Sequence, residues 1–190
     1  MFPEMRRRQQ QLSSEESIQV LKNGIHGVLA VLGQNGYPYT VPLSYVYEKG
    51  KIFFHCAKTG YKLEALKKED KVSFCVVDQD DIVPEEYTTY FRSVIVFGRA
   101  RILQNEEEKR QAIQLLARRY SPMESDLHLH TAIEKGIHAL CMVELNIEHM
   151  TGKEAIELVR KKADKKTDMS DEGSAPTFIS VFIRRGKDGI

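Results

Sequence analysis

The sequence predicts a mainly β protein, a six-stranded antiparallel β-barrel with flanking helices. Three observations support this fold class. Short apolar segments recur along the chain, turn signals join the first of them, and the helical segments lie at the periphery. Strands this short and this few leave exposed edges unless the sheet curls into a barrel. The expected strands are residues 27–32, 39–47, 51–57, 72–77, 92–103 and 137–147.

Turn residues join the first three strands as hairpins. Gln34–Gly36 contains Asn-Gly, which accepts the positive φ angles of a type I′ turn, and Glu48–Gly50 supplies the second turn. Pro38 and Pro42 cannot donate ladder hydrogen bonds. Pro42 in mid-strand therefore indicates an edge strand or a bulge.

The first helix has a clear start signal. Ser13 and Glu16 fit a capping box, and Gly24 marks the end of the helix that follows. The polar and basic residues 1–12 that come before it predict a loose arm. Further along we expect a helix at 62–68, an acidic irregular loop at 78–90, a helix at 106–120, an ambiguous segment at 127–136 that could be a helical turn, a turn at 150–153, and a last helix or strand end at 154–161.

The composition divides the chain into one domain and a tail. Residues 1–160 are expected to form the barrel domain, and 161–190 a C-terminal linker and tail of unknown role. Residues 161–176 are polar and charged, which predicts a flexible linker. Thr177–Ile183 is an isolated apolar segment that could be a strand docking on a partner chain.

Charge and cysteine content exclude several classes of protein. A formal net charge of +1 gives no general electrostatic reason to expect nucleic acid or an acidic membrane as a partner. Three cysteines without close spacing indicate reduced thiols. The N-terminus lacks the apolar core of a secretory signal, and no apolar run approaches the roughly 18 residues of a membrane span. We therefore expect a cytoplasmic protein.

The most informative segment is Ile52–Leu66, which predicts a strand, a tight polar loop and the first turn of a helix. Apolar residues lead into His55, and Thr59 with Gly60 then breaks the strand pattern. A glycine loop at a helix N-terminus directs free backbone N–H groups at one place, and Lys62 adds a cation there. Such an arrangement suits a phosphate group.

Together these residues resemble a known family. Arg6-Arg7 precede the capped helix, Gly36-Tyr37-Pro38 precedes Val41–Tyr45, and Ile52–Ala57 precedes Gly60–Lys62. With Thr151-Gly152-Lys153 near the end, the pattern is similar to the nitroimidazole-resistance branch of the pyridoxamine 5′-phosphate oxidase-like FMN-binding split barrels, over about residues 5 to 160.

The resemblance implies a homodimer with FMN at the subunit interface, and a small-molecule acceptor. It implies that Lys62 pairs with the flavin phosphate and that the long fifth strand comes from the other subunit. Phosphate and ribityl contacts would come from the loop and the strand end, and backbone contacts beside the ring from the second strand. The implied cofactor residues are Pro42, Leu43, Ser44, His55, Cys56, Ala57, Thr59, Gly60 and Lys62.

Other readings of the same residues stay open. His55 is the candidate catalytic side chain, although a lone histidine at a strand end is more often structural. Cys56 and Cys75 are best interpreted as small core residues, because a nucleophilic thiol needs an exposed electropositive setting. Arg6–Arg8 could lie beside the cofactor or be purely structural.

A metal site is a weaker hypothesis. His128 and His130, with His138 and Cys141 further on, offer metal-binding side chains. The alternation of His128 and His130 with leucines fits an amphipathic segment equally well, so we expect no metal.

The leading functional hypothesis is an FMN-dependent oxidoreductase that passes electrons from a reduced nicotinamide or flavin to a small electron-poor acceptor. The alternatives are a non-catalytic flavin or haem carrier or sensor, a pyridoxamine-phosphate-oxidase-like enzyme, and a structural barrel. The arginine-rich phosphate motif of true pyridoxamine phosphate oxidases is not visible in Tyr39–Tyr47, which argues against vitamin B6 oxidation.

Overall fold

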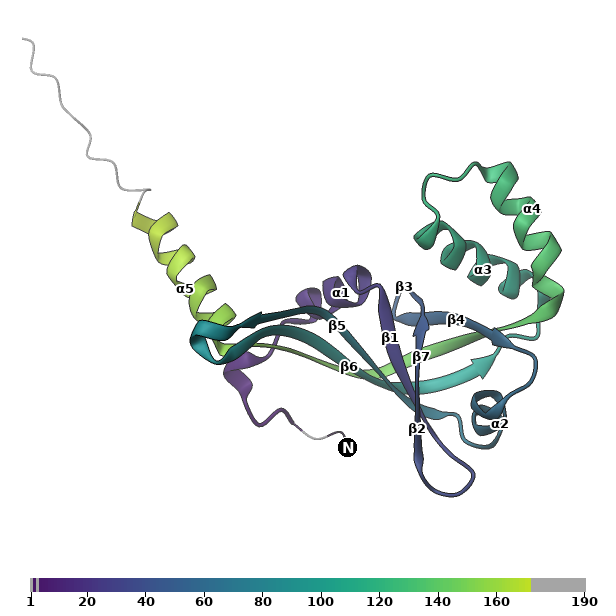
Figure 1. Ribbon diagram of the computed structural model, residues 1–190, viewed down its shortest axis with the longest axis horizontal. Coiled ribbons are helices and arrows are strands. Elements are labelled where there is room, and N and C mark those ends of the chain that lie inside the picture. Colours follow the sequence, from purple (N-terminus) through teal and green to yellow (C-terminus); the bar gives the residue numbers. More distant parts are fainter. Residues whose placement is uncertain (1, 3, 172–190) are drawn as a thin grey trace, which may run out of the picture.

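A computed structural model describes residue 2 and residues 4–171 of the chain. Its described part contains one antiparallel sheet with helices around it (Figure 1). The strands are β1 (His26–Leu32), β2 (Pro38–Ser44), β3 (Val46–Glu48), β4 (Lys51–Ala57), β5 (Lys71–Val83), β6 (Thr88–Ile102) and β7 (Leu140–Glu154). The helices are α1 (Ser14–Asn23), α2 (Tyr61–Lys68), α3 (Glu106–Tyr120), α4 (Asp126–Gly136) and α5 (Ile156–Asp171), with 3₁₀ turns η1 (Arg8–Gln10), η2 (Pro84–Glu86) and η3 (Ile137–Ala139).

The strand order is β2-β1-β5-β6-β7-β4-β3, and every neighbouring pair is antiparallel. The sheet curls but does not close, so it is a split barrel with β2 and β3 at its edges. Pro42 lies on the edge strand β2, which confirms the edge expected from its missing N–H. Figure 1 shows α3 and α4 at one end of the sheet and α5 at the other.

The main core fills the inside of the curved sheet. Its largest fully buried side chains are Tyr45, Phe54 and Phe74, and Tyr45 meets Phe74 edge to face with ring centroids 5.1 Å apart. Apolar residues of α1 and α2 complete this core. A second, smaller cluster lies under α3 and consists of Val46, Leu103, Ala112, Leu116 and Met142.

The second expected strand divides at Tyr45, so the sheet has seven strands rather than six. The Tyr45 N–H donates to the Tyr120 hydroxyl at 3.0 Å instead of to a neighbouring strand. The Tyr45 hydroxyl in turn donates to the Leu21 carbonyl at 2.7 Å. These contacts with α1 and α3 interrupt the strand between β2 and β3.

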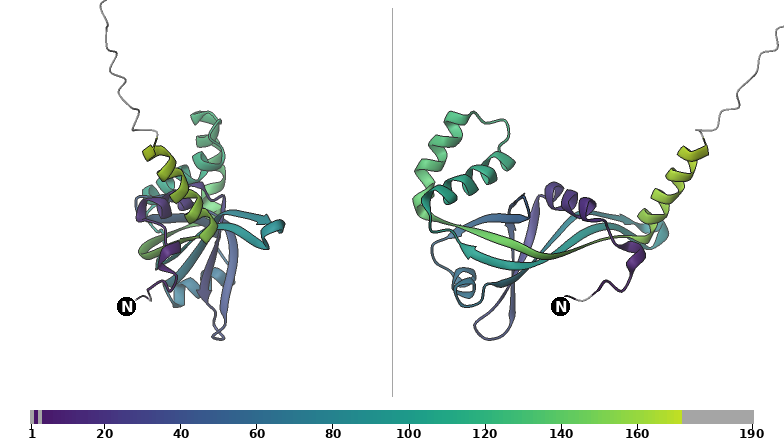
Figure 2. Two further views of the ribbon diagram at one scale, coloured as in Figure 1. Left: turned by 90° about the vertical axis from the view of Figure 1, so that its left-hand side faces the viewer. Right: turned by 180° about the vertical axis from the view of Figure 1, so that it is seen from behind.

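The expected loop at 78–90 is wrong, because most of it forms a long hairpin. Its two strands pair from Gln79↔Arg92 to Val83↔Thr88, and a bulge lies at Asp78. The Asp78 carboxylate is almost fully buried and accepts two hydrogen bonds from Arg92, at 2.7 and 2.9 Å. The left view of Figure 2 shows this hairpin, in teal, projecting from the body of the protein.

Two expectations near the C-terminus are also corrected. Residues 150–153 form the end of β7 rather than a turn, because they pair with β6 from Ile95↔Thr151 onward. Helix α5 continues to Asp171, where a flexible linker was expected from residue 161. The rest of that linker and the apolar segment Thr177–Ile183 lie outside the described residues.

Turns and caps follow the sequence more closely. The capping box of Ser13 and Glu16 is present in both directions, and at the second hairpin turn Lys49 and Gly50 both have positive φ, at 47° and 80°. The type I′ turn expected from Asn35-Gly36 is wrong, because only Gly36 has a positive φ there (83°), and its N–H donates to the Gly33 carbonyl at 3.0 Å. The N-terminal arm is docked rather than loose. The Leu12 N–H donates to the Gly152 carbonyl at 3.0 Å, and the Gln10 side chain donates to the Glu154 carbonyl at 3.0 Å.

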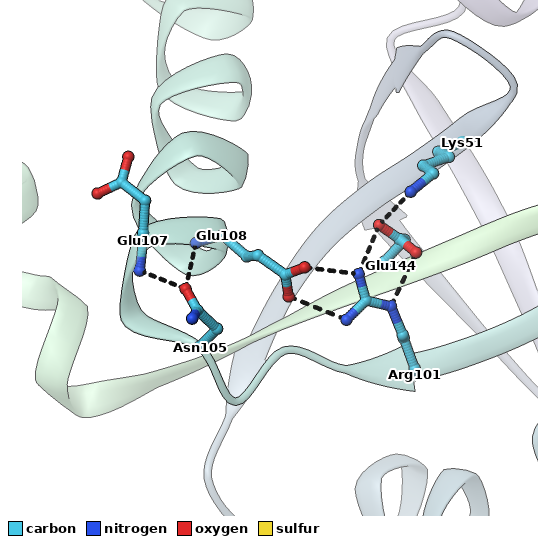
Figure 3. A network of polar contacts seen from close by, with 6 residues as sticks. All are labelled: Lys51, Arg101, Asn105, Glu107, Glu108 and Glu144. Carbon is cyan, nitrogen blue, oxygen red and sulfur yellow. Dashed lines mark hydrogen bonds and ion pairs between the residues drawn. The ribbon is translucent and has the colours of Figure 1, made fainter.

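An ion-pair network fixes β4 against its neighbours (Figure 3). Glu144 on β7 has a side chain only 8% exposed, and it accepts hydrogen bonds from Lys51 of β4 at 2.9 Å and from Arg101 of β6 at 2.9 and 3.1 Å. Arg101 also reaches Glu108 of α3, whose first turn is capped by Asn105. The strand that leads into the predicted phosphate loop is therefore tied to two strands and a helix.

Candidate functional site

The junction between β4 and α2 has the geometry of an anion site. Gly60 caps α2 with φ 131° and ψ 161°, and its carbonyl accepts hydrogen bonds from the amides of Leu63 and Glu64 at 3.0 and 3.1 Å. As a glycine, it offers no side chain to cap the helix. The amides of Tyr61 and Lys62 donate no hydrogen bond to another described residue. Two N–H groups at the positive end of a helix thus remain free for a ligand.

A cavity of about 210 Å³ opens at this junction. It lies where the edge strand β2 approaches the end of β4, so it occupies the split of the barrel. The lining comes from β2, from the end of β4 and the loop after it, and from the first turn of α2. The residues are Tyr39, Val41, Cys56, Ala57, Thr59, Gly60, Tyr61, Lys62 and Leu63.

The cavity brings together five of the nine residues expected to bind a cofactor: Cys56, Ala57, Thr59, Gly60 and Lys62. His55 does not line it. Alternate side chains of a strand point to opposite faces, and the flanking Phe54 and Cys56 are buried inside the barrel while His55 is exposed.

The expected residues of β2 lie beside the cavity rather than in it. Pro42 is exposed, and Ser44 is half-buried. The half-buried Leu43 packs against the main core. These three residues follow directly after Val41, which does line the cavity.

Four lining residues were not predicted from the sequence: Tyr39, Val41, Tyr61 and Leu63. Two of them had a signal, because Tyr39 and Val41 share one face of a strand by their spacing of two. Tyr61 had none. Its hydroxyl accepts from the Gln34 N–H at 3.1 Å, and its ring meets that of Tyr39 at 4.9 Å, so it ties α2 to the first hairpin.

Lys62 brings a positive charge to the junction cavity. Its side chain is half-buried, and it forms no ion pair with another described residue. Although much of His55 is exposed, partial loss of hydration at its ring lowers its pKa below 6.5, and the charge of Lys62 lowers it further. Burial raises the pKa of the Cys56 thiol, while Lys62 opposes that rise. An unpaired cation beside free amides favours a bound anion.

The arginines of the N-terminal arm line a different cavity. Arg6–Arg8, together with Gln9, Gln10 and Ile156, border a space of about 500 Å³ between η1 and the start of α5. None of the residues at the β4–α2 junction lines it.

The histidines considered for a metal do not form a cluster. His128 contacts Glu124, and His130 lies 4.0 Å from Glu134, both within one helical turn. Across residues 2 and 4–171, no group of three or more His, Cys, Asp or Glu side chains is arranged to hold a metal ion. Nor does this part of the chain contain a helix that is long and apolar enough to cross a membrane.

The fold and the junction together define a split-barrel protein with a cavity beside the start of α2. Residues 13–154 match the family model described as pyridoxamine 5′-phosphate oxidase. The match covers well over half of the chain, so the protein belongs to this family. No curated protein matches the chain.

Solved structures share the fold. A candidate 5-nitroimidazole antibiotic resistance protein from Bacteroides thetaiotaomicron is 20% identical with a TM-score of 0.63, over 75% of this chain and 85% of that one. An FAD-binding protein from Mesorhizobium loti is 25% identical with a TM-score of 0.58, over 76% and 96%. An FAD- and haem-binding protein from Mycobacterium smegmatis is 20% identical with a TM-score of 0.64, over 77% and 73%.

Proposed function

We propose that this protein binds FMN, with the flavin phosphate at the N-terminus of α2. The observation that carries the proposal is the unpaired Lys62 beside the free amides of Tyr61 and Lys62 at a glycine-capped helix start. A phosphate supplies the acceptors that those donors lack, and its negative charge suits both the cation and the helix dipole. The donor set therefore fits the cofactor.

The residues have separate roles in this proposal. Thr59, Gly60 and Lys62 hold the phosphate, and Cys56 with Ala57 lines the ribityl chain. The β2 residues Pro42, Leu43 and Ser44 pass beside the isoalloxazine ring and contact it through their backbone. An edge strand suits this role, because the backbone groups on its outer side have no neighbouring strand.

The size of the cavity supports a site shared between two chains. Pockets that enclose a whole small molecule have about 300–1,000 Å³. The junction cavity has about 210 Å³, which suits the phosphate end of a flavin rather than the whole molecule. The ring would then lie outside the cavity, against a surface that a second copy of the chain completes.

A row of mostly apolar residues on the outside of the sheet supports the homodimer, with Pro42, Val28 and Ile95 exposed and Cys75 and Thr151 half-buried. The row runs across five strands through residues that pair directly: Pro42↔Val28, Val28↔Cys75, Cys75↔Ile95 and Ile95↔Thr151. Val28 is 39% exposed and Ile95 43% exposed. Exposed apolar patches of this kind mark interaction surfaces. Pro42 belongs to both this outer row and the proposed ring contacts.

For the chemistry we propose an oxidoreductase that passes electrons from a reduced nicotinamide or flavin to a small electron-poor acceptor, such as a nitroimidazole. Bound FMN would supply the redox chemistry, while the chain supplies binding, orientation and charge. We propose His55, which directly precedes Cys56 on β4, as the side chain that moves a proton, because a pKa below 6.5 leaves it mostly neutral at pH 7. It can then donate from one ring nitrogen and accept at the other.

A second candidate is a flavin or haem carrier without turnover. This candidate is supported by the structural similarity to an FAD- and haem-binding protein, with a TM-score of 0.64. A pyridoxamine-phosphate-oxidase-like activity has the family description in its favour, while the missing arginine-rich motif in Tyr39–Tyr47 argues against it.

The absorption spectrum of the purified protein tests the proposal, followed by release of the chromophore and its mass. We expect the bands of oxidised flavin and the mass of FMN. The mass of FAD or haem would instead support one of the other cofactors. A colourless protein that does not take up added FMN would contradict flavin binding.

Turnover separates the enzyme from the carrier. With FMN bound, we expect steady consumption of reduced nicotinamide only when an electron-poor acceptor such as a nitroimidazole or a quinone is present. A single reduction of the flavin without continued consumption would instead support the carrier.

A further inference from the structure

Two of the three cysteines face each other across neighbouring strands. Cys56 of β4 is the direct register partner of Cys141 of β7, and all three cysteines are free thiols. Residues directly opposite in an antiparallel pair project to the same face of the sheet. Cys56 belongs to the main core, and the partly buried Cys141 packs against it. The pair could not be predicted from the sequence, because 84 residues separate the two cysteines along the chain.

The register is compatible with a disulfide. The Cα atoms of directly opposite residues lie about 4.5–5.5 Å apart in antiparallel pairs. Disulfides span Cα separations of about 4.4–6.8 Å, with Cβ atoms about 3.5–4.5 Å apart. A bond between Cys56 and Cys141 therefore needs at most a small approach of the two Cβ atoms. Cys75 offers no such partner, because it lies opposite Val28 and Ile95.

Small reagents can reach Cys56 through the junction cavity. Cys56 is only 7% exposed, yet it lines the cavity of about 210 Å³ together with Lys62. Burial raises the pKa of the Cys56 thiol, and the Lys62 cation favours its thiolate, which is the reactive form. Cys141 is its register partner on the neighbouring strand β7 and is half-buried.

We propose that Cys56 and Cys141 form a reversible redox modification site that a hydroperoxide converts into an intrachain disulfide. The Cys56 thiolate attacks one peroxide oxygen, which breaks the O–O bond and gives a sulfenic acid and, for hydrogen peroxide, water. The Cys141 sulfur then attacks the Cys56 sulfur, which forms the S–S bond and releases a second water. In sum, two thiols and one H₂O₂ give one disulfide and two H₂O.

The inference does not depend on flavin binding. It rests on the register of β4 and β7 and on the access that the cavity gives. Its consequence is a covalent link between these strands at the base of the β4–α2 loop, which a reduced dithiol would reverse.

The test treats the reduced full-length protein with hydrogen peroxide, alkylates the remaining thiols without reduction, and maps the peptides by mass spectrometry. We expect one linked peptide pair that contains Cys56 and Cys141, lower in mass by the two thiol hydrogens, while Cys75 stays alkylated. Dithiothreitol should restore alkylation of both residues. The protein should remain a single chain on a non-reducing gel.

Several outcomes would overturn the proposal. These are a linked peptide that contains Cys75, a bond between two chains, over-oxidation of Cys56 without linkage, or full alkylation of Cys56 and Cys141 after prolonged exposure. A Cys75→Ser variant should give the same linked pair as the wild type.

A Cys141→Ser variant tests the order of the two steps. Without its partner thiol, the Cys56 sulfenic acid should persist and give a dimedone adduct. The wild type should give much less adduct, because Cys141 consumes the sulfenic acid. Equal adduct yields in the two proteins would show that the second thiol does not react.

Discussion

Gly60 has a backbone conformation that a side chain would strain. Its φ of 131° and ψ of 161° fall in a region that is essentially restricted to glycine. A Cβ there would meet no atom within 4 Å, so the cost of a substitution comes from the backbone alone. This residue shapes the start of α2 and thereby the direction of its free amides.

Gly60→Ala should therefore lower the free energy of unfolding by about 1–3 kcal/mol, measured by chemical denaturation. Gly136→Ala is the matched control. Gly136 ends α4 with a negative φ and also has no neighbour within 4 Å of a Cβ, so this change should be neutral or mildly stabilising. Equal stability of the two variants would refute the assigned role of the Gly60 conformation.

The pKa of His55 is sensitive to the charge of Lys62. Partial loss of hydration at the ring, and then the charge of Lys62, lower the pKa of His55 below 6.5. The folded protein thus binds fewer protons than the unfolded chain just below pH 6.5. The contribution of His55 to stability is therefore complete above that pH and is lost as the pH falls through the folded-state pKa.

We expect an NMR titration of the His55 ring to give a midpoint below 6.5. The Lys62→Ala variant should move that midpoint upward, and His55→Asn should weaken the loss of stability on acidification. A midpoint at or above 6.5 in the wild-type protein would contradict the assignment of these two causes.

Site residues could be predicted from the sequence where a pattern within a few neighbouring residues marks them. Lys62 and Gly60 were found because a glycine before a helical period marks a helix start. Tyr39 and Tyr61 were not identified as site residues, because their ring contact joins an edge strand to a helix across more than 20 residues of sequence.

Strand β6 carries two arginines that each pair with two carboxylates. One carboxylate bound by Arg101 is buried, whereas both bound by Arg99 are largely exposed. Arg101 binds the buried carboxylate of Glu144, shown in Figure 3, as well as Glu108. Arg99 binds Asp70 and Glu148, whose side chains are 46% and 40% exposed. Exposed ion pairs add little to stability, whereas a buried carboxylate that loses its partner is costly.

Arg101→Ala should thus destabilise the protein more than Arg99→Ala in chemical denaturation. We expect a loss of about 1–2 kcal/mol for Arg101→Ala, because Lys51 still neutralises Glu144 and solvent screens the half-exposed guanidinium. Equal losses for both variants would contradict the importance of the burial of Glu144.

The acid stability of this network follows from the same geometry. Burial of Glu144 would raise its pKa, but the hydrogen bonds from Arg101 and Lys51 outweigh it and hold the pKa below 4.5. The stabilisation by Glu144 is therefore present above pH 4.5 and is lost as the pH falls through its folded-state pKa.

Turns and helix starts that are marked by neighbouring residues were predicted from the sequence. Features that depend on contacts between distant residues were not. Asn35-Gly36 and the capping box of Ser13 and Glu16 act within a few residues, so they could be identified directly. The break at Tyr45 depends on the distant Tyr120, and the 78–90 hairpin depends on Arg92 neutralising the buried Asp78. The exposed acidic residues Asp80 and Asp81 on its first strand, with Glu85 and Glu86 in its turn, gave that hairpin the composition of a loop.

For the whole molecule, the antiparallel class of the fold was predictable, while the position of β7 was not. Successive turn signals indicate hairpins, and hairpins are antiparallel. The last strand, however, pairs with both β6 and β4 and so joins the two halves of the sheet, a choice that no local pattern encodes. The Cys56–Cys141 pair is a direct result of this placement.

The proposed dimer is also a property of the whole molecule. Ile95 is an exposed residue of the outer row, and Leu127 is an apolar residue on α4 that is 78% exposed. By light scattering we expect the wild type and Leu127→Glu to be dimers and Ile95→Glu to be shifted toward monomers, with weaker FMN binding. A monomeric wild type, or an Ile95→Glu dimer as stable as the wild type, would contradict an interface on this row.

The central claim is that the start of α2 binds the phosphate of a flavin, and Lys62 provides its most direct test. Lys58 lies in the same loop and is exposed, but it does not line the cavity, so Lys58→Ala is the matched control. Riboflavin has the flavin ring without the phosphate and separates a phosphate contact from a general loss of structure.

The measurement is the dissociation constant of FMN and of riboflavin for the wild type, Lys62→Ala and Lys58→Ala, from quenching of flavin fluorescence. Lys62→Ala should weaken FMN binding by about tenfold or more, since a charge-assisted hydrogen bond contributes about 1.5–3 kcal/mol. Riboflavin binding should not change, and Lys58→Ala should behave like the wild type. FMN affinity that is unchanged by Lys62→Ala, or an equal loss for FMN and riboflavin, would contradict the phosphate site.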